Sequence, residues 1–364
     1  MIESILLLGG VKLNEFTPNY ENIVIAAKNC VPERLPLYEH IISTEVMEVI
    51  TNSKFADLIE GDTAEKHEFF RHYCSFFREM GYDTVSFEAC ITSILPSGGA
   101  LGGHVPGVIK TRSDFEKYPW KDLSTIFFQR YSETFAALRD QMPAGMKAIG
   151  GPGNGIFECV QDLVGYEELS YISIDDPELY ADLFKAVGSV AFEIWSQLLK
   201  EYGDIYCVCR FGDDLGFNTS TLLPPKDISK HVIPQYAKII DLVHSYKKPF
   251  LLHSCGKIFD VMDEIIKVAK IDAKHSNEDT IALFPYWVEK YGDKIGLFGG
   301  IDMDHLCMKS VPDIKEIVLK AINDCEGKCG FALGSGNSIA NYVPAAGYLA
   351  MVETVREYRG DFKK

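Results

Sequence analysis

Short apolar runs typical of β-strands alternate along this chain with longer amphipathic stretches typical of helices. Eight runs stand out, at residues 35–39, 84–88, 148–151, 205–210, 250–253, 271–275, 295–299 and 331–334. The clearest helical stretches cover residues 64–80, 177–202, 226–245, 258–270, 281–291, 314–323 and 345–358. Strands that alternate with helices form parallel sheets, and eight such units suit a closed (β/α)8 TIM barrel better than an open doubly wound sheet. We therefore predict an α/β fold with a single barrel domain over residues 1–364, including an N-terminal helical extension over residues 1–33.

Composition and charge argue against several classes of protein. Of the 364 residues 47% are hydrophobic, which is too many for a disordered chain. The chain has 36 basic and 52 acidic side chains and a net charge of −16, so neither nucleic acid nor an anionic membrane is the expected partner. No secretory signal and no apolar run near the roughly 18 residues that span a bilayer stand out. Ten cysteines without such a signal indicate a reducing cytoplasm, with free or metal-bound thiols.

Polar side chains follow the predicted strands, where a barrel of this kind places its active site. The candidates for catalysis are Glu39, Glu88, Asp213 and Asp214, and those for substrate binding are His40, Arg210, Asn218, Glu278, Asp302, Ser335 and Asn337. A carboxylate at a strand end can take a proton, bind a metal or pair with an arginine. On an exposed loop it is more often solvated, or caps the next helix. Because a closed sheet brings strand ends together, we predict that Glu39, Glu88, Asp213 and His253 face a common pocket.

His253 and Cys255 form the sharpest local signal for a metal site. They lie two residues apart at the end of an apolar run, so the imidazole and the sulfur can converge. Zinc accepts this pair of ligands, and a catalytic zinc keeps three protein ligands and one open position. The alternative is a buried histidine bonded to the backbone beside an apolar cysteine. Cys325 and Cys329 precede the last predicted strand, at the other end of a barrel, and two free thiols are the favoured interpretation there.

Several of these motifs together resemble the uroporphyrinogen decarboxylase superfamily, over about residues 34–358. The motifs are Gly-Asp-Asp-Leu-Gly at 212–216, Leu-His-Ser-Cys-Gly at 252–256, Phe-Gly-Gly-Ile-Asp at 298–302, Gly-Ser-Gly-Asn-Ser-Ile at 334–339 and Tyr-Val-Pro at 342–344. The resemblance implies a (β/α)8 barrel, in agreement with the strand count.

The decarboxylase branch of that superfamily fits this chain poorly. Its members carry an arginine-rich segment after the first strand, whereas residues 37–45 here contain no arginine. The catalytic aspartate of that branch falls on Ala89. Since each buried carboxylate of a polycarboxylate substrate needs a paired cation, decarboxylation of a porphyrinogen is not expected.

The corrinoid-dependent methyltransferase branch fits better. Its zinc site is of the His-x-Cys…Cys type, and His253 and Cys255 match the first two ligands, whereas the third falls on Ser335. A carboxylate or histidine from another loop is then expected to replace that cysteine, and the candidates are Glu39, His40, Glu88 and Glu278.

The resemblance implies a methyltransferase that moves a methyl group between a small O- or N-methylated substrate, or a thiol acceptor, and cobalt. The corrinoid is expected on a partner protein, because no segment here resembles a corrinoid-binding module, and zinc is expected to assist. The missing cysteine favours demethylation of an O- or N-methyl substrate over methylation of a thiol. A homodimer is compatible with the sequence. The alternatives are a decarboxylase of a smaller acid that uses Arg210, and a non-catalytic ligand-binding barrel.

Overall fold

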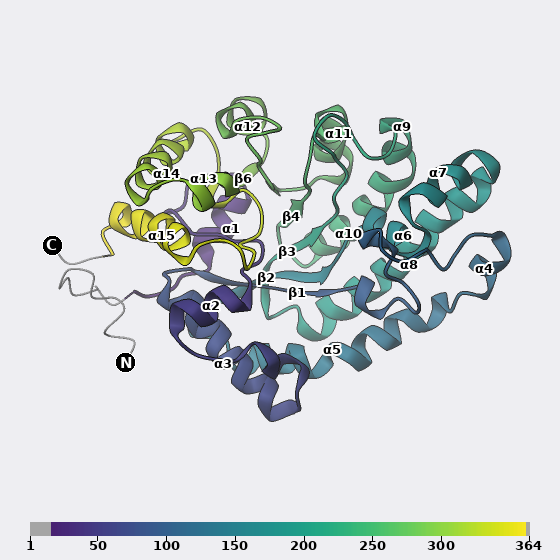
Figure 1. Cartoon of the computed structure of the whole chain (residues 1–364), viewed down its shortest axis with the longest axis horizontal. Coiled ribbons are helices and arrows are strands. Elements are labelled where there is room, and N and C mark those ends of the chain that lie inside the picture. The colour runs from purple at the N-terminus through teal and green to yellow at the C-terminus, as the bar shows by residue number, and fades with distance from the viewer. Residues whose placement is uncertain (1–15, 362–364) are drawn as a thin grey trace. The chain divides into compact units, whose positions relative to one another are not determined.

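The computed structural model describes residues 16–361 and shows an α/β fold with seven parallel strands (Figure 1). The strands are β1 Thr84–Cys90, β2 Lys147–Gly153, β3 Tyr206–Gly212, β4 Phe250–His253, β5 Ala273–His275, β6 Gly296–Ile301 and β7 Phe331–Ser335. Their order in the sheet is their order in the chain. This order confirms the predicted alternation of strand and helix. The predicted N-terminal extension falls partly on residues 1–15, outside the described residues.

The eighth predicted strand, residues 35–39, is not a strand in the structure. Only Leu37 is paired there, in an isolated parallel bridge to Leu333. Pro36 has no N–H to donate to a ladder, which shortens the pairing to the bonds on either side of Leu37. Those bonds run from the Tyr38 N–H to the Leu333 carbonyl and from the Leu333 N–H to the Pro36 carbonyl, at 2.9 and 3.0 Å. A complete eight-stranded barrel is therefore not formed by the described residues.

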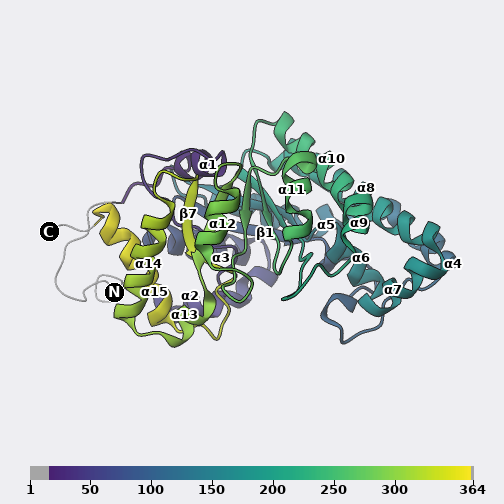
Figure 2. The same cartoon turned by 90° about the horizontal axis from the view of Figure 1, so that it is seen from above.

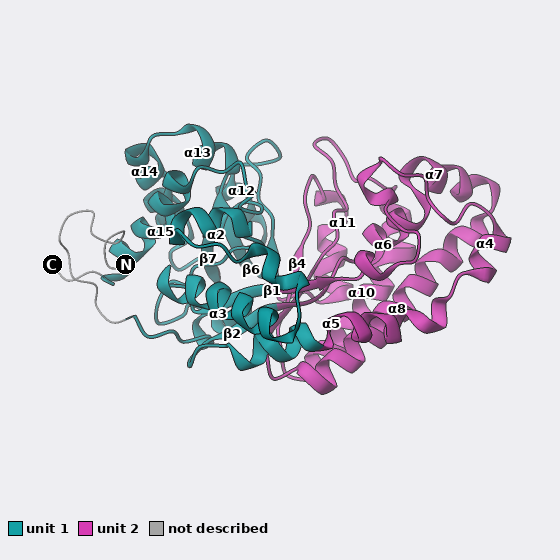
Figure 3. Cartoon of the chain, turned by 60° about the horizontal axis from the view of Figure 1, so that its bottom comes forward, with its two compact units in different colours: residues 1–86, 133–149, 273–364 teal, residues 87–132, 150–272 magenta. Residues whose placement is uncertain are grey.

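The chain folds into two compact units, each built from separate segments (Figure 3). Unit 1 comprises residues 1–86, 133–149 and 273–364, and unit 2 comprises residues 87–132 and 150–272. The strands β1 and β2 and the helix α5, Leu123–Asp140, contribute residues to both units.

Unit 1 packs helices around β5, β6 and β7. Its helices are α1 Glu21–Ala27, α2 Thr44–Thr51, α3 Thr63–Glu79, α12 Phe284–Tyr291, α13 Met303–Met308, α14 Val311–Cys325 and α15 Ala345–Arg359, with a 3₁₀ turn at Ala56–Glu60. The helix α3 lies within one residue of the predicted stretch 64–80, begins at a capping box formed by Asp62 and Glu65, and is followed by Gly81 at φ +86°. The helices α14 and α15 lie side by side (Figures 1 and 2).

Unit 2 packs helices around the paired strands β3 and β4. Its helices are α4 Arg112–Lys117, α6 Ile156–Val164, α7 Tyr166–Asp175, α8 Pro177–Tyr202, α9 Pro225–Asp227, α10 Ile233–Ser245 and α11 Phe259–Glu264. Shorter 3₁₀ turns lie at Thr92–Ile94, Ala100–Gly102 and Trp120–Asp122, and π-helical turns at Ile228–Val232 and Ile265–Ala269. The helix α8 has the predicted bounds, and its buried Trp195 lies against Gly151, where a Cβ atom would be 2.4 Å from the indole. Among the described residues, no helix is long and apolar enough to cross a bilayer.

Candidate functional site

The carboxyl ends of β3 and β4 bring three potential metal ligands together in unit 2. The two strands are parallel and pair Gly212 with His253, so the residues after β3 lie beside the end of β4. The Asp213 N–H extends the ladder by donating to the His253 carbonyl at 2.9 Å. Asp214 follows β3 by two residues and Cys255 follows β4 by two residues, so both lie at the same edge of the sheet.

The donor atoms of Asp214, His253 and Cys255 all lie within 4.8 Å of one another. His253 Nε2 is 3.4 Å from Cys255 Sγ and 3.8 Å from Asp214 Oδ1. Asp214 Oδ1 also accepts a hydrogen bond from the Cys255 N–H at 2.8 Å, which fixes the Asp214 carboxylate beside the loop that follows β4. His253 is 5% exposed, whereas the Asp214 side chain is 43% exposed, so the cluster is open to a ligand on the aspartate side.

Two glycines allow the loops that carry these ligands to approach so closely. Gly256 has φ +77°, and a Cβ atom there would be 2.2 Å from the Gly216 carbonyl carbon. A Cβ atom on Gly216 would in turn be 2.7 Å from Gly256. Backbone therefore packs on backbone, which explains why both motifs end in glycine.

The three side chains fit a zinc ion in their chemistry and their spacing. Tetrahedral zinc with ordinary Zn–S, Zn–N and Zn–O bonds separates its ligand atoms by about 3.4 to 3.6 Å. The observed separations of 3.4 and 3.8 Å lie close to that range. One thiolate and one carboxylate would balance the charge of the ion, and three protein ligands would leave a fourth position for substrate.

Two further acidic residues, Glu158 and Asp213, hold the backbone around Asp214. The Glu158 carboxylate, in the first turn of α6, accepts the Asp214 N–H at 3.2 Å and the Asn154 amide at 2.8 Å. Burial, together with the negative charges of Asp213 and Asp214, raises the pKa of Glu158 well above its usual value. Glu158 therefore fixes the loop that presents Asp214.

Asp213 serves as the anchor of the helix α6. Its fully buried carboxylate accepts the N–H groups of Phe157 and Glu158 at 2.9 and 2.8 Å, and the Tyr236 hydroxyl from α10. Burial raises the pKa of Asp213 to about 6, and these hydrogen bonds oppose that rise. A carboxylate that caps a helix start is favoured by the exposed N–H groups and by the helix dipole.

Glu88 and Arg210 form an ion pair in the same unit. Glu88 Oε2 accepts from Arg210 Nη2 at 2.9 Å and from Nε at 3.2 Å, and the arginine is fully buried. The pair neutralises both charges. The Arg210 guanidinium, predicted to bind substrate, therefore binds the carboxylate of Glu88 in the structure.

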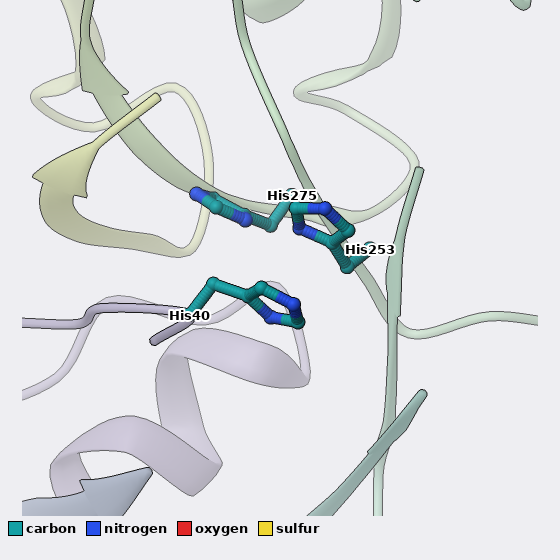
Figure 4. Close-up of side chains that lie close together, drawn as sticks. All are labelled: His40, His253 and His275. Carbon is teal, nitrogen blue, oxygen red and sulfur yellow. The ribbon is translucent and has the colours of Figure 1, made fainter. Parts of the chain in front are cut away.

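Unit 1 carries a second group of the candidates at the ends of β5 and β7. Glu39 is fully buried and accepts the Ser335 N–H at 3.0 Å and the Ser335 hydroxyl. Burial raises the pKa of Glu39 to about 8, despite these two bonds. His275 Nε2 donates to the Ser335 carbonyl at 2.9 Å, and its ring centroid lies 5.8 Å from that of His40 (Figure 4).

Three more candidates line one cavity of unit 1, with a volume of about 460 Å³. Glu278 accepts the Asn337 amide at 2.9 Å. Asp302 caps α13 by accepting the Asp304 N–H at 2.8 Å, and it accepts the Asp279 N–H at 2.7 Å. Asn218, by contrast, is exposed on the loop after β3 in unit 2.

The structure thus groups the candidates separately within the two units. Unit 2 brings Asp213, Asp214, His253 and Cys255 together. Glu39 belongs to unit 1, so its sharing of a pocket with Glu88, Asp213 and His253 stays a prediction. Sequence reasoning missed Glu158 and Tyr236. An acidic residue in the first turn of the helix after Gly155 is the one signal that could have indicated Glu158.

Comparison with known proteins relates the chain to one family and to several solved structures. The model of the family described as uroporphyrinogen decarboxylase (URO-D) matches residues 45–358. A methyltransferase from Methanosarcina mazei has a TM-score of 0.71 at 16% identity, and the match covers 93% of this chain and 98% of that one. The putative vitamin-B12 independent methionine synthase from Listeria monocytogenes has a TM-score of 0.51 at 12% identity, covering 96% and 99%. At these identities the likeness is one of fold. No curated protein matches the sequence.

Proposed function

Because this chain belongs to the uroporphyrinogen decarboxylase family, we propose that it is a methyltransferase of that family with zinc held by Asp214, His253 and Cys255. The observation that carries the proposal is the convergence of these three ligands at the paired ends of β3 and β4. Similarity in fold to the Methanosarcina mazei methyltransferase supports the choice of reaction.

Asp214 takes the role of the third ligand in this proposal. In the methyltransferase branch the third zinc ligand is a cysteine, and that position falls on Ser335 in this sequence. The candidates for the third ligand were therefore Glu39, His40, Glu88 and Glu278. Glu88 is paired with Arg210, and Glu278 with Asn337. Asp214 lies next to His253 in the same unit and its carboxylate is already positioned by the Cys255 N–H. The proposed site therefore has one thiolate, one imidazole and one carboxylate.

Zinc at this position would act as a Lewis acid on the heteroatom that carries the methyl group, which makes that heteroatom a better leaving group. The residues of the chain supply the positioning. Glu158 and the Cys255 N–H hold Asp214, and Asp213 fixes the start of α6. A carboxylate in place of a second thiolate makes the site harder, which suits an O- or N-methylated donor better than a thiol acceptor. We propose a corrinoid on a partner protein as the methyl acceptor.

The alternative activity, decarboxylation of a small acid, is less well supported by the arrangement in unit 2. Such a reaction needs a cation to bind the substrate carboxylate, and the proposed one was Arg210. In the structure the Arg210 guanidinium already binds Glu88. A substrate carboxylate would have to displace a buried ion pair, which is costly.

Metal content tests the proposed ligands. The protein purified without chelator is expected to hold about one zinc ion per chain. Cys255→Ala and Asp214→Asn should both lower that content, whereas Cys307→Ala, which alters another partly buried thiol, should not. Zinc content below about 0.2 equivalents that does not change in Cys255→Ala would rule the site out.

A methyl-transfer assay tests the reaction. The protein is mixed with a reduced corrinoid protein and with methoxyaromatics, methylamines or betaines, and the absorbance of the corrinoid reports methylation of Co(I). We expect that change for at least one donor, and its loss in Cys255→Ala. If no donor gives the change while the protein alone releases CO₂ from a carboxylic acid, the chain is a decarboxylase instead.

A further inference from the structure

A hydrogen-bond network in unit 2 connects the residues after β1 to the proposed metal ligands. It begins at Thr92, whose hydroxyl donates to Asn154 Oδ1 at 2.8 Å. Asn154 Nδ2 donates to Glu158 Oε2 at 2.8 Å, and Glu158 Oε1 accepts the Asp214 N–H at 3.2 Å. The Cys255 N–H then donates to Asp214 Oδ1 at 2.8 Å. The network thus passes through residues that follow β1, β2, β3 and β4 in turn.

The side-chain amide of Asn154 is held in one orientation within this network. Its Oδ1 also accepts the Thr92 N–H at 3.4 Å, and a backbone N–H can only donate. The amide oxygen must therefore face Thr92, which leaves the NH₂ group to face the Glu158 carboxylate. The reverse orientation would place two acceptors against each other. Asn154 therefore joins a donor on one side to an acceptor on the other.

The backbone around Asn154 explains why a short side chain occupies this position. Asn154 has φ +64°, a left-handed conformation that asparagine adopts more readily than most residues. It lies between two glycines that pack closely on other strand ends. A Cβ atom on Gly155 would be 2.2 Å from Asp213 Cβ, and one on Gly153 would be 3.0 Å from the Glu88 carboxyl carbon. These contacts fix Asn154 between the ends of β1 and β3.

We propose that Asn154 is a positioning residue for the proposed metal site. Its amide holds the Glu158 carboxylate, and Glu158 holds the loop that carries Asp214. The inference rests on the proposed function, because it takes Asp214 as a metal ligand. Repulsion between the two carboxylates would turn Glu158 away from the Asp214 N–H, and the hydrogen bond from Asn154 opposes that movement. Partners that orient a ligand in this way contribute about 10- to 100-fold to metal affinity.

Metal affinity and the spectrum of bound cobalt test the proposal on the full chain. The metal-free protein is titrated with zinc in competition with a chelating dye, and separately with Co²⁺, whose visible absorption bands report its ligands and their geometry. Asn154→Gly removes the amide without adding backbone strain, because glycine adopts positive φ freely. We expect the zinc dissociation constant to rise at least about tenfold, and the cobalt bands to shift in the same direction as in Asp214→Asn.

Matched variants separate the role of the amide from a general loss of stability. Asn52 ends α2 in unit 1 at φ +49°, so Asn52→Gly makes the same change in the same backbone conformation, and it should alter neither readout. Thr92→Val removes the hydroxyl at the start of the network and should shift the cobalt bands, whereas Thr92→Ser should restore them. The circular dichroism spectrum of each variant checks that it is folded.

The outcomes distinguish failure of this inference from failure of the proposed function. If the unmodified protein binds zinc, but Asn154→Gly has the zinc affinity and the cobalt spectrum of Asn52→Gly, the positioning role is overturned and the metal site stands. Weaker zinc binding by Asn154→Gly with an unchanged cobalt spectrum also overturns it, since the ligands are then arranged as before. If the unmodified protein binds neither zinc nor cobalt, the metal site and the positioning role are both overturned.

Discussion

Glu39 is a buried acid with too few hydrogen bonds to stay ionised at neutral pH. Its side chain is fully buried, and Ser335 supplies the two hydrogen bonds described above. Desolvation raises its pKa to about 8, so the folded protein keeps a proton that the unfolded chain has already lost. This difference makes Glu39 a source of pH-dependent stability.

Replacing Glu39 by glutamine should remove that dependence. Between the unfolded pKa of 4.5 and the folded pKa of about 8 the native state binds more protons, so stability falls as the pH rises. The contribution is fully present below pH 4.5 and is lost by about pH 8. From pH 5 to pH 8 the unmodified protein should lose up to about 4 kcal/mol relative to Glu39→Gln. Urea unfolding of both proteins at several pH values measures this.

The exposed Glu316 provides the control, because Glu316→Gln should follow the pH profile of the unmodified protein. Parallel profiles of the unmodified protein and of Glu39→Gln would show that the carboxyl group ionises equally in both states, and the prediction would be wrong.

Asp214 should contribute directly to metal affinity. Asp214→Asn keeps the size of the side chain and removes the negative charge that lies 3.8 Å from His253 Nε2. We expect the zinc dissociation constant to rise at least about tenfold, as measured by competition with a chelating dye. Asp260→Asn, at an exposed position in the first turn of α11, should leave it unchanged. Equal affinities for both variants would exclude Asp214 as a ligand.

The sequence allowed the individual residues of the candidate site to be predicted, but not which of them lie next to one another. His253 and Cys255 were indicated by their spacing along one strand. Asp214 was indicated by its place after another strand, but its position beside His253 depends on the register of β3 and β4 and on the contact of Gly216 with Gly256. Neither of these is visible in a single sequence.

At the scale of secondary structure elements, the hydrogen bonds of Asp213 link the end of β3 to α6 and α10, and they should contribute measurably to the free energy of unfolding. Tyr236→Phe removes the hydroxyl that donates to the buried Asp213 carboxylate. At pH 8, above the pKa of about 6, that carboxylate is ionised, and the loss should destabilise the protein by about 1.5 to 3 kcal/mol. Chemical denaturation measures the change. Tyr342→Phe, at a 70% exposed tyrosine, should change stability by less than about 0.5 kcal/mol. Similar values for both would contradict the anchoring role.

Most elements could be predicted because their signals are local. The helix α8 follows an Asp-Pro start, and α3 follows a capping box, so both begin within one residue of the predicted positions. The stretch 226–245 is helical throughout, as predicted, but it contains a π-helical turn at Ile228–Val232 just before Pro234, which cannot donate to the preceding turn. The prediction of a strand at residues 35–39 failed, because its apolar pattern outweighed Pro36.

At the scale of the whole molecule, zinc should stabilise unit 2 first, because all three proposed ligands belong to it. At a free zinc concentration of 100 times the dissociation constant, binding adds up to about 2.7 kcal/mol to the cost of opening the site. Hydrogen exchange should therefore slow in residues 206–216 and 250–257, as followed by mass spectrometry. Cys255→Ala should show no such slowing. Protection confined to unit 1 would contradict the placement of the metal.

The division into two units was not apparent in the sequence. No linker or change in composition marks residues 86, 132, 149 or 272, where the chain passes from one unit to the other. Two of these passages, at residues 86 and 149, occur inside the strands β1 and β2, and another lies inside α5. A boundary within a regular element leaves no glycine-rich or proline-rich signal.

The order of these segments along the chain also determines which unit can fold first during synthesis. A ribosome completes unit 2 at Asp272, whereas unit 1 still needs residues 273–364 and with them β5, β6 and β7. Chains fold during synthesis as complete units become available. The proposed zinc ligands can therefore assemble on a nascent chain whose first unit is unfinished, and metal supply during translation would then favour the correct pairing of β3 with β4.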